Sequence, residues 1–83
     1  MGERRPKRLA EKLLQIREAL GLTQHEMAEC VGERAGIKEL TYKNISKYER
    51  DKSIPSLEIG LAYARVANVT FEQIVDDEME LDL

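Results

Sequence analysis

The chain has 83 residues, which is enough for one small domain and leaves little room for a second. Hydrophobic residues make up 42% and charged residues 35% of the sequence, as in ordinary globular proteins, and no apolar run approaches the roughly 18 residues of a membrane helix. One cysteine and one histidine exclude a disulfide scaffold and a zinc site built from these residue types. We therefore expect a cytoplasmic protein with no membrane segment, metal or other cofactor.

The net charge of −3 is unevenly distributed along the sequence. All 13 basic residues lie between Arg4 and Arg65, whereas residues 72–83 contain six acidic residues and no basic one. A basic body with an acidic tail is compatible with nucleic-acid binding but does not establish it. The overall acidic balance argues against a non-specific DNA coat protein, which would be strongly basic.

The first predicted helix covers about residues 7–20. Its apolar residues are Leu9, Leu13, Ile16 and Leu20, which follow the spacing of a single helical stripe. Pro6 suits the start of such a helix, and Gly21 suits its end.

A threonine preceded by one apolar residue and followed four positions later by another occurs three times. The copies are Leu22-Thr23…Met27, Leu40-Thr41…Ile45 and Val69-Thr70…Ile74. Each is typical of a threonine N-cap inside a hydrophobic staple, and Glu26 and Gln73 complete capping boxes in the first and third copies. The pattern predicts helices over about 24–31, 42–50 and 71–78.

A further helix is predicted over about 56–67, because Leu57, Leu61 and Ala64 keep helical spacing and Asn68 can adopt the left-handed conformation that ends it. The sequence thus predicts an all-α fold of five short helices, with a core at about 7–75 and an acidic tail at 76–83. The connection at 32–41 is long. The expected core is Leu9, Leu13, Ile16, Leu20, Leu22, Met27, Ala28, Val31, Ile45, Tyr48, Leu57, Leu61, Ala64, Val69 and Ile74.

The helix predicted over 42–50 has two different faces. Ile45 and Tyr48 face a core, while Lys43, Lys47 and Arg50 recur on the opposite side. Ser46 lies near these cations, and Tyr42 and Asn44 flank them. Such a face can neutralise phosphates and read base edges. A solvated charged face is the alternative interpretation.

A tight turn, a short capped helix and then a cationic helix is the arrangement of a helix-turn-helix unit. Over about residues 9–75 the sequence resembles the lambda-repressor/Cro-like (XRE-type) helix-turn-helix family. The matching segments are Ile16-Arg17-Glu18-Ala19-Leu20-Gly21-Leu22-Thr23-Gln24, Met27-Ala28, Val31-Gly32, Ile45-Ser46-Lys47-Tyr48-Glu49-Arg50, Pro55-Ser56-Leu57-Glu58, Leu61, Ala64 and Val69-Thr70-Phe71-Glu72-Gln73-Ile74.

The resemblance implies sequence-specific binding of double-stranded DNA by a homodimeric transcriptional regulator that acts by occupying its operator. It places Tyr42, Lys43, Asn44 and Lys47 in the major groove, where the lysines would favour guanine and Asn44 would favour adenine. Phosphate contacts would come from Gln24, Ser46, Arg50 and Lys52. Arg17 would pair with Glu49 and join the first helix to the recognition helix.

The sequence departs from this family between the second and third helices, where about residues 33–39 are additional. One hypothesis is that this loop reaches toward DNA and places Arg34 or Lys38 near a phosphate. The alternative is a plain solvent-exposed loop. His25, beside Gln24, is expected to be a surface residue or a neutral phosphate donor.

Two other functions remain open at this point. The protein could be the antitoxin of a toxin–antitoxin pair, with its acidic, Leu-bearing tail binding the toxin; the tail could also extend the last helix, dimerise or be disordered. Alternatively, the protein could be an interaction module that uses the long loop as its partner surface. An enzyme is not expected, because the sequence offers no nucleophile–base pair, glycine-rich phosphate loop or metal set.

Overall fold

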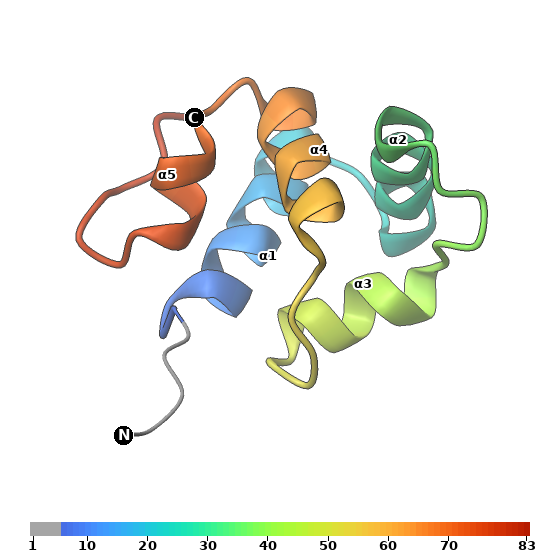
Figure 1. Ribbon diagram of the computed structural model, residues 1–83, viewed down its shortest axis with the longest axis horizontal. Helices are drawn as coiled ribbons and strands as arrows, with labels where there is room; N and C mark the ends of the chain where they lie inside the picture. The colour runs from blue at the N-terminus through green and yellow to red at the C-terminus, as the bar shows by residue number, and fades with distance from the viewer. Residues whose placement is uncertain (1–5) are drawn as a thin grey trace.

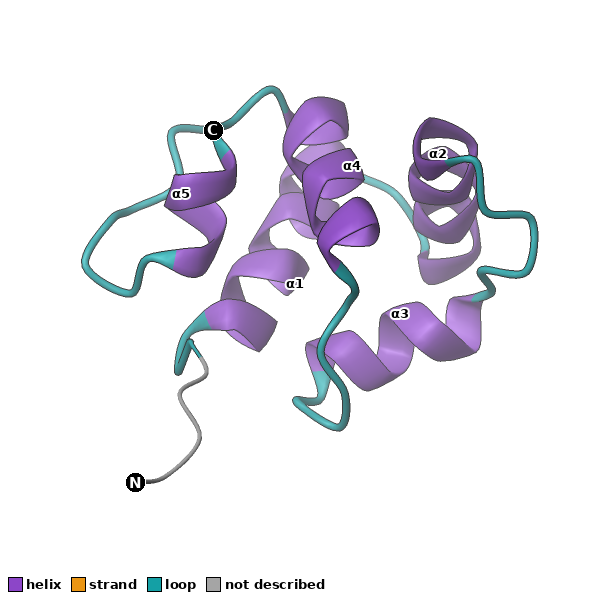
Figure 2. Ribbon diagram, in the orientation of Figure 1, coloured by secondary structure: helices purple, strands orange, loops and turns teal. Residues whose placement is uncertain are grey.

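A computed structural model describes residues 6–83, so Arg4 and Arg5 of the basic N-terminal segment lie outside the described residues. Within residues 6–83 the chain forms five helices and no strand, which confirms the predicted all-α class (Figures 1 and 2). The helices are α1 (Leu9–Leu20), α2 (Gln24–Ala35), α3 (Tyr42–Glu49), α4 (Leu57–Ala67) and α5 (Phe71–Val75). No helix of this part is long and apolar enough to cross a membrane.

The five helices enclose one core. Helix α2 packs against α3 and α4, and α1 packs against α3, α4 and α5. In Figure 1, α1 and α4 occupy the centre, α5 lies on one side of them, and α2 and α3 lie on the other. This arrangement leaves α3 along one edge of the molecule.

Three helices begin at the predicted threonines. Thr23 accepts a hydrogen bond from the backbone of Glu26, whose side chain in turn accepts one from the Thr23 N–H. Thr70 and Gln73 form the same reciprocal pair. These capping boxes satisfy backbone N–H groups that the first helical turn would otherwise leave unpaired.

Helix α2 is longer than predicted. It continues four residues past the expected end and stops at Gly36, whose φ of 72° is a left-handed conformation that glycine adopts at low cost. Gly32, which the sequence placed in the long connection, instead lies buried inside α2. The connection to α3 is therefore residues 36–41, and the predicted loop over 32–41 is wrong in its first part.

The predicted face of α4 was also wrong. Leu57 is 63% exposed, whereas Ile59, Ala62 and Tyr63 are buried with Ala64. All residues of this helix except Glu58 and Arg65 are apolar or glycine, so the spacing of Leu57, Leu61 and Ala64 alone did not identify the buried face. Of the other expected core residues, Leu20 is exposed and Leu22, Leu61 and Val69 are only partly buried.

A glycine inside α4 has a steric reason. A Cβ atom on Gly60 would lie 2.8 Å from Cε1 of Phe71, the first residue of α5. The missing side chain therefore lets the aromatic ring pack directly on the backbone of α4. This contact offsets the cost of up to about 1 kcal/mol for glycine relative to alanine in a helix.

The acidic tail folds back onto α1. Helix α5 ends at Val75 rather than near residue 78, because Asp76 adopts an extended conformation and turns the chain. The fully buried ammonium group of Lys12 then donates to the carbonyl oxygens of Gln73, Asp76 and Met79, at 2.7, 2.6 and 2.6 Å. A cation beside the last carbonyls of a helix is favourable.

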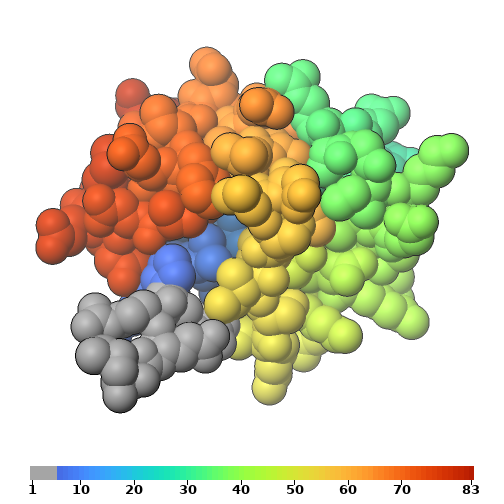
Figure 3. Space-filling view, in the orientation of Figure 1, coloured from blue at the N-terminus to red at the C-terminus, as the bar shows by residue number. Residues whose placement is uncertain are grey.

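A second set of contacts holds the tail to the start of α1. The Asp77 carboxylate accepts hydrogen bonds from the backbone N–H groups of Lys7 and Arg8, at 2.9 and 3.0 Å. The Arg8 guanidinium donates twice to Glu80, at 2.9 and 3.0 Å. In Figure 3 only a small part of α1 shows between the C-terminal segment and the α3–α4 connection. The tail is thus neither an extension of α5 nor a free segment.

Candidate nucleic-acid interface

Helix α3 presents a basic face to solvent. Ile45 and Tyr48 are buried, and Lys43, Lys47 and Arg50 are exposed on the other side, as the spacing predicted. Lys52 is exposed just beyond the helix, where its backbone N–H donates to the carbonyl of Lys47 at 2.8 Å. In Figure 1, α3 lies along the lower edge of the molecule, with no other helix below it.

A single carboxylate fixes the position of α3. Glu49, whose side chain is 5% exposed, accepts two hydrogen bonds from Arg17 of α1, at 2.7 Å from Nε and 3.1 Å from Nη2. Gln24, the first residue of α2, donates from Nε2 to the same carboxylate at 3.1 Å. The Glu49 carboxylate raises the pKa of the Arg17 guanidinium, which stays charged. These bonds, which we call the Glu49 lock, tie α3 to both α1 and α2.

Two buried groups support the Glu49 lock. Arg17 also donates from Nη1 to the carbonyl of Leu22 at 3.0 Å, which fixes the turn between α1 and α2. The fully buried Tyr63 of α4 is electrostatically coupled to Glu49 and Arg17, and burial is the main cause that raises the pKa of its phenol. The Tyr63 hydroxyl has no hydrogen-bond partner among the described residues.

Two polar side chains of α3 are engaged within the helix. The Oδ1 atom of Asn44 accepts hydrogen bonds from the backbone N–H and the hydroxyl of Thr41, at 2.9 and 3.3 Å. Ser46 accepts a hydrogen bond from Nε of Arg50 at 3.1 Å. Sequence reasoning missed the role of Asn44 in the cap, although Thr-x-x-Asn differs from a capping box only in its last residue.

An aromatic pair joins the first turns of α2 and α3. The ring of Tyr42, which is 39% exposed, lies with its centroid 4.3 Å from that of His25, and the two planes are inclined by 33°. Offset and tilted arrangements of this kind are favourable for aromatic rings. His25 therefore contacts the first residue of α3, a role that the sequence did not indicate.

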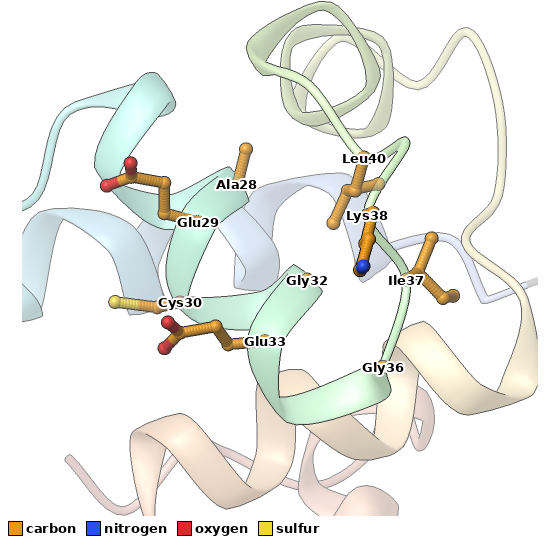
Figure 4. Close-up of a pocket in the computed structure, with 9 residues that line it drawn as sticks. All are labelled: Ala28, Glu29, Cys30, Gly32, Glu33, Gly36, Ile37, Lys38 and Leu40. Atoms are coloured by element: carbon orange, nitrogen blue, oxygen red, sulfur yellow. The ribbon is translucent and has the colours of Figure 1, made fainter.

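The connection between α2 and α3 encloses a surface hollow of about 620 Å³ (Figure 4). Figure 4 shows Glu29, Cys30 and Glu33 on the α2 side of this hollow, with Lys38 and Leu40 on the loop. Lys38 is exposed in the loop. Arg34, expected in the same loop, instead lies exposed on the last turn of α2.

The sequence and the known structures identify the fold. The helix-turn-helix family profile matches residues 13–74 of the chain. The chain belongs to the XRE-type helix-turn-helix family. In this helix-turn-helix, α2 is the first helix of the motif and α3 takes the place of the recognition helix. None of the curated proteins matches the sequence significantly.

The solved structures that share this fold include a DNA-binding domain and a repressor protein. The N-terminal DNA-binding domain of SinR from Bacillus subtilis has a TM-score of 0.66 and 22% identity, over 88% of this chain and 97% of that one. The P22 c2 repressor, solved in complex with a synthetic operator, has a TM-score of 0.65 and 20% identity, over 84% and 96%.

A third similar structure is the complex of SinR with SinI, with a TM-score of 0.65 and 21% identity. There the alignment covers 84% of this chain and 62% of the other, so the helix-turn-helix domain spans less than two thirds of that protein. At these levels of identity the likeness shows the fold alone.

Most of the predicted site residues lie on α3 or next to it. Tyr42, Lys43, Asn44 and Lys47 all lie on α3, and Gln24 reaches its end through Glu49. Within residues 6–83 no group of three or more His, Cys, Asp or Glu side chains is placed to hold a metal ion. The surface is therefore built from cations, amides and one aromatic pair.

Proposed function

We propose that the protein binds specific sequences of double-stranded DNA and regulates transcription by occupying an operator. The observation that carries this proposal is the exposed basic face of α3, held in one orientation by the Glu49 lock. A helix of this kind fits the major groove, where its side chains reach base edges. The fold, which the chain shares with operator-binding repressors, supports the same function.

Contacts with phosphates would set the register of α3. Gln24 uses one amide N–H on Glu49, which leaves its second N–H for a phosphate. Backbone N–H groups of the first turn of α2 that the Thr23 capping box does not use could add to this contact. Arg50, paired with Ser46, and Lys52 would contact the backbone beside the groove. Such contacts provide affinity without sequence information.

We further propose that the protein binds as a homodimer. One recognition helix contributes few base contacts, and a two-fold dimer doubles them on a symmetric site. The two half-sites would then lie about one helical turn, or 34–36 Å, apart. An operator of this form is the expected product of selection from random DNA.

The loop hypothesis is testable on its own. Lys38 is exposed beside the start of α3, and a contact between its ammonium group and a phosphate would release one counterion. The variant Lys38→Ala should then lower the slope of log affinity against log salt by about one. An unchanged slope would favour a plain solvent-exposed loop.

A protein partner bound through the acidic tail would meet competition within the domain. The tail is held by Lys12 and Arg8, so a toxin or another partner would have to displace these contacts or bind the outer side of the tail. The SinR–SinI complex shows that a protein with this fold can have a protein partner. Among residues 6–83, no contact specifically favours the antitoxin function over DNA regulation.

The decisive experiment is selection from a random duplex pool at two salt concentrations. The protein should recover a two-fold symmetric motif, and Lys43→Ala/Lys47→Ala should lose it. The control Lys7→Ala/Arg65→Ala removes two exposed charges away from α3 and should keep the motif. A pool that stays random, with only weak and salt-sensitive binding, would contradict the proposal.

A further inference from the structure

The carboxylate and amide oxygens of α3 are already hydrogen-bonded within the protein. Only Asn44 and Glu49 of this helix carry a carboxylate or amide oxygen. Oε2 of Glu49 accepts from Arg17, and Oε1 accepts from both Arg17 and Gln24. Both oxygens of this carboxylate are thus used within the protein, and its side chain is 5% exposed.

Asn44 is divided between two tasks. Its Oδ1 accepts the two hydrogen bonds from Thr41 that cap α3, so only the Nδ2 group, a donor, remains for another partner. Ser46 uses its oxygen as an acceptor for Arg50, which leaves the hydroxyl proton for donation. The same capping that starts the helix therefore limits what Asn44 can read.

The remaining polar groups on this face are donors. Lys43 and Lys47 are exposed, and an ammonium group has three donors and no acceptor. The Tyr42 hydroxyl can donate as well as accept, so it fits an acceptor edge without conflict. The face of α3 consequently offers mainly hydrogen-bond donors to the groove, and its free lone pairs are those of the Tyr42 and Ser46 hydroxyls, which can also donate.

We infer that α3 reads guanine and rejects adenine and cytosine at the positions it contacts. In the major groove guanine presents two adjacent acceptors, O6 and N7, whereas adenine presents an amino donor beside N7 and cytosine presents an amino donor. A donor facing a donor leaves both groups unsatisfied. This inference rests on the proposed function and makes it more specific.

The inference also replaces the assignment of Asn44 to adenine. Recognition of adenine by an amide requires an oxygen that accepts from N6 and a nitrogen that donates to N7. Because the Oδ1 of Asn44 already accepts from Thr41, Asn44 can only donate from Nδ2 to the N7 of adenine. Asn44 is therefore a positioning residue for α3 that can add one donor to the guanine-reading face.

The first arm of the test uses base analogues in the operator obtained by selection. The full chain is titrated at one salt concentration against duplexes that carry single substitutions. 7-Deazaguanine, which lacks the N7 acceptor, should weaken binding about tenfold at each contacted guanine. Inosine, which keeps O6 and N7, should stay within about twofold unless the minor groove is also read.

The second arm supplies the missing acceptor. Lys43→Gln and Lys47→Gln each add an amide that can both accept and donate, so selection with these variants should admit adenine at one position of each half-site. Arg65→Gln, which removes a charge from the last turn of α4, is the matched control and should select the wild-type motif.

The outcomes separate the two claims. A symmetric motif whose contacted positions are adenine would overturn the guanine inference and leave the proposed function intact. In that case, replacing adenine by purine, which lacks the N6 amino group, would weaken binding and show that α3 accepts a hydrogen bond from this group. A pool that stays random would overturn the proposed function and the inference together. A guanine motif sensitive to 7-deazaguanine, and shifted by the glutamine variants, supports both.

Discussion

The backbone N–H of Arg8 donates to Oδ1 of Asp77 at 3.0 Å, so a carboxylate from the far end of the chain caps the start of α1. The helix has no cap from its own N-cap side chain. An acceptor with negative charge is favourable at a helix N-terminus, because it pairs free N–H groups and complements the helix dipole. The acidic tail is therefore structural as well as charged.

This cap makes stability depend on pH. Hydrogen bonds from the backbone of Lys7 and Arg8 lower the pKa of Asp77, and the Arg8 guanidinium lowers the pKa of Glu80. Because the folded state holds these protons more weakly than the unfolded state, the stabilisation is complete above the ordinary carboxyl pKa of about 4 and is lost as the pH falls through the lowered pKa values. Thermal melts from pH 7 to pH 2 should show this loss as a fall in melting temperature. In the variant Asp77→Asn, the plot of melting temperature against pH should be flatter below about pH 4. The exposed neighbour Glu78→Gln is the control, and an unchanged curve for Asp77→Asn would count against the cap.

The Lys12 ammonium should be needed for the docked tail. Lys12→Met keeps most of the side-chain volume but removes the donor from the carbonyls of Gln73 and Met79. The Asp76 carbonyl loses its shortest hydrogen bond and keeps the one from the Met79 N–H, at 3.0 Å. Each buried carbonyl left unpaired costs about 1–3 kcal/mol, so the free energy of unfolding should fall by at least about 2 kcal/mol. Urea denaturation measures this loss of stability. In hydrogen exchange, the backbone amides of residues 77–81 should exchange faster in Lys12→Met than in the exposed control Lys7→Met. A variant with wild-type stability and exchange would contradict the role of Lys12.

The Glu49 lock should be costly to break from one side only. Arg17→Met leaves the nearly buried carboxylate of Glu49 with Gln24 alone, and such a change costs about 3–5 kcal/mol for a buried pair. Since 19% of the Arg17 side chain is exposed, we expect a value near the lower limit. The double variant Arg17→Met/Glu49→Met should regain part of this stability, because no unpaired charge remains. Equal stabilities of the single and double variants would argue against a buried ion pair.

The path of the 36–41 loop depends on the absence of a side chain at Gly32. A Cβ at this position would lie 2.8 Å from the carbonyl oxygen of Ile37, a backbone atom that cannot rotate away. Gly32→Ala should therefore destabilise the fold by about 1–3 kcal/mol, reduced by up to about 1 kcal/mol through the better helix propensity of alanine. Glu33→Ala, at an exposed position of the same turn, should be nearly neutral. Denaturant titration of both variants decides whether the loop packs on α2 in this way.

The ring contact between His25 and Tyr42 should appear as a coupling energy. A double-mutant cycle with His25→Ala and Tyr42→Ala should give a favourable coupling energy near the lower end of the range of about 0.5–1.5 kcal/mol for aromatic pairs, because both residues are exposed. The same cycle measured for DNA affinity tests whether His25 positions Tyr42 for the groove. His25→Phe keeps a ring and should preserve the coupling, whereas additive single effects would show that the contact has no energetic role.

The sequence predicted the helices whose signals are local. The threonine caps at 23, 41 and 70 and the left-handed Asn68 all lie within a turn of the helix end that they define, and the structure confirms them. The basic face of α3 was equally readable, because Ile45 and Tyr48 alternate with Lys43 and Lys47 at helical spacing.

Features that depend on distant partners could not be predicted. Asp77 caps α1 and Lys12 binds the end of α5 across more than 60 residues, so neither has a local pattern. Tyr63 was not predicted as a core residue because all residues of α4 except Glu58 and Arg65 are apolar or glycine, and tertiary packing selects which of them face inward. The engagement of Asn44 with Thr41 was local, but a capping box ending in asparagine is a weaker signal than one ending in glutamate.

The contact between Arg8 and Glu80 also has a topological consequence. It joins the segment that precedes α1 to the segment that follows α5, so hydrogen bonds close a ring that contains all five helices. A peptide linker between these two segments could make this closure covalent, and new ends could be opened in the 36–41 segment. Such a circular permutant would join the tail to α1 through the backbone while separating α2 from α3. The difference in melting temperature between this permutant and the original chain would show which covalent connection stabilises the domain more, the one between the tail and α1 or the one between α2 and α3.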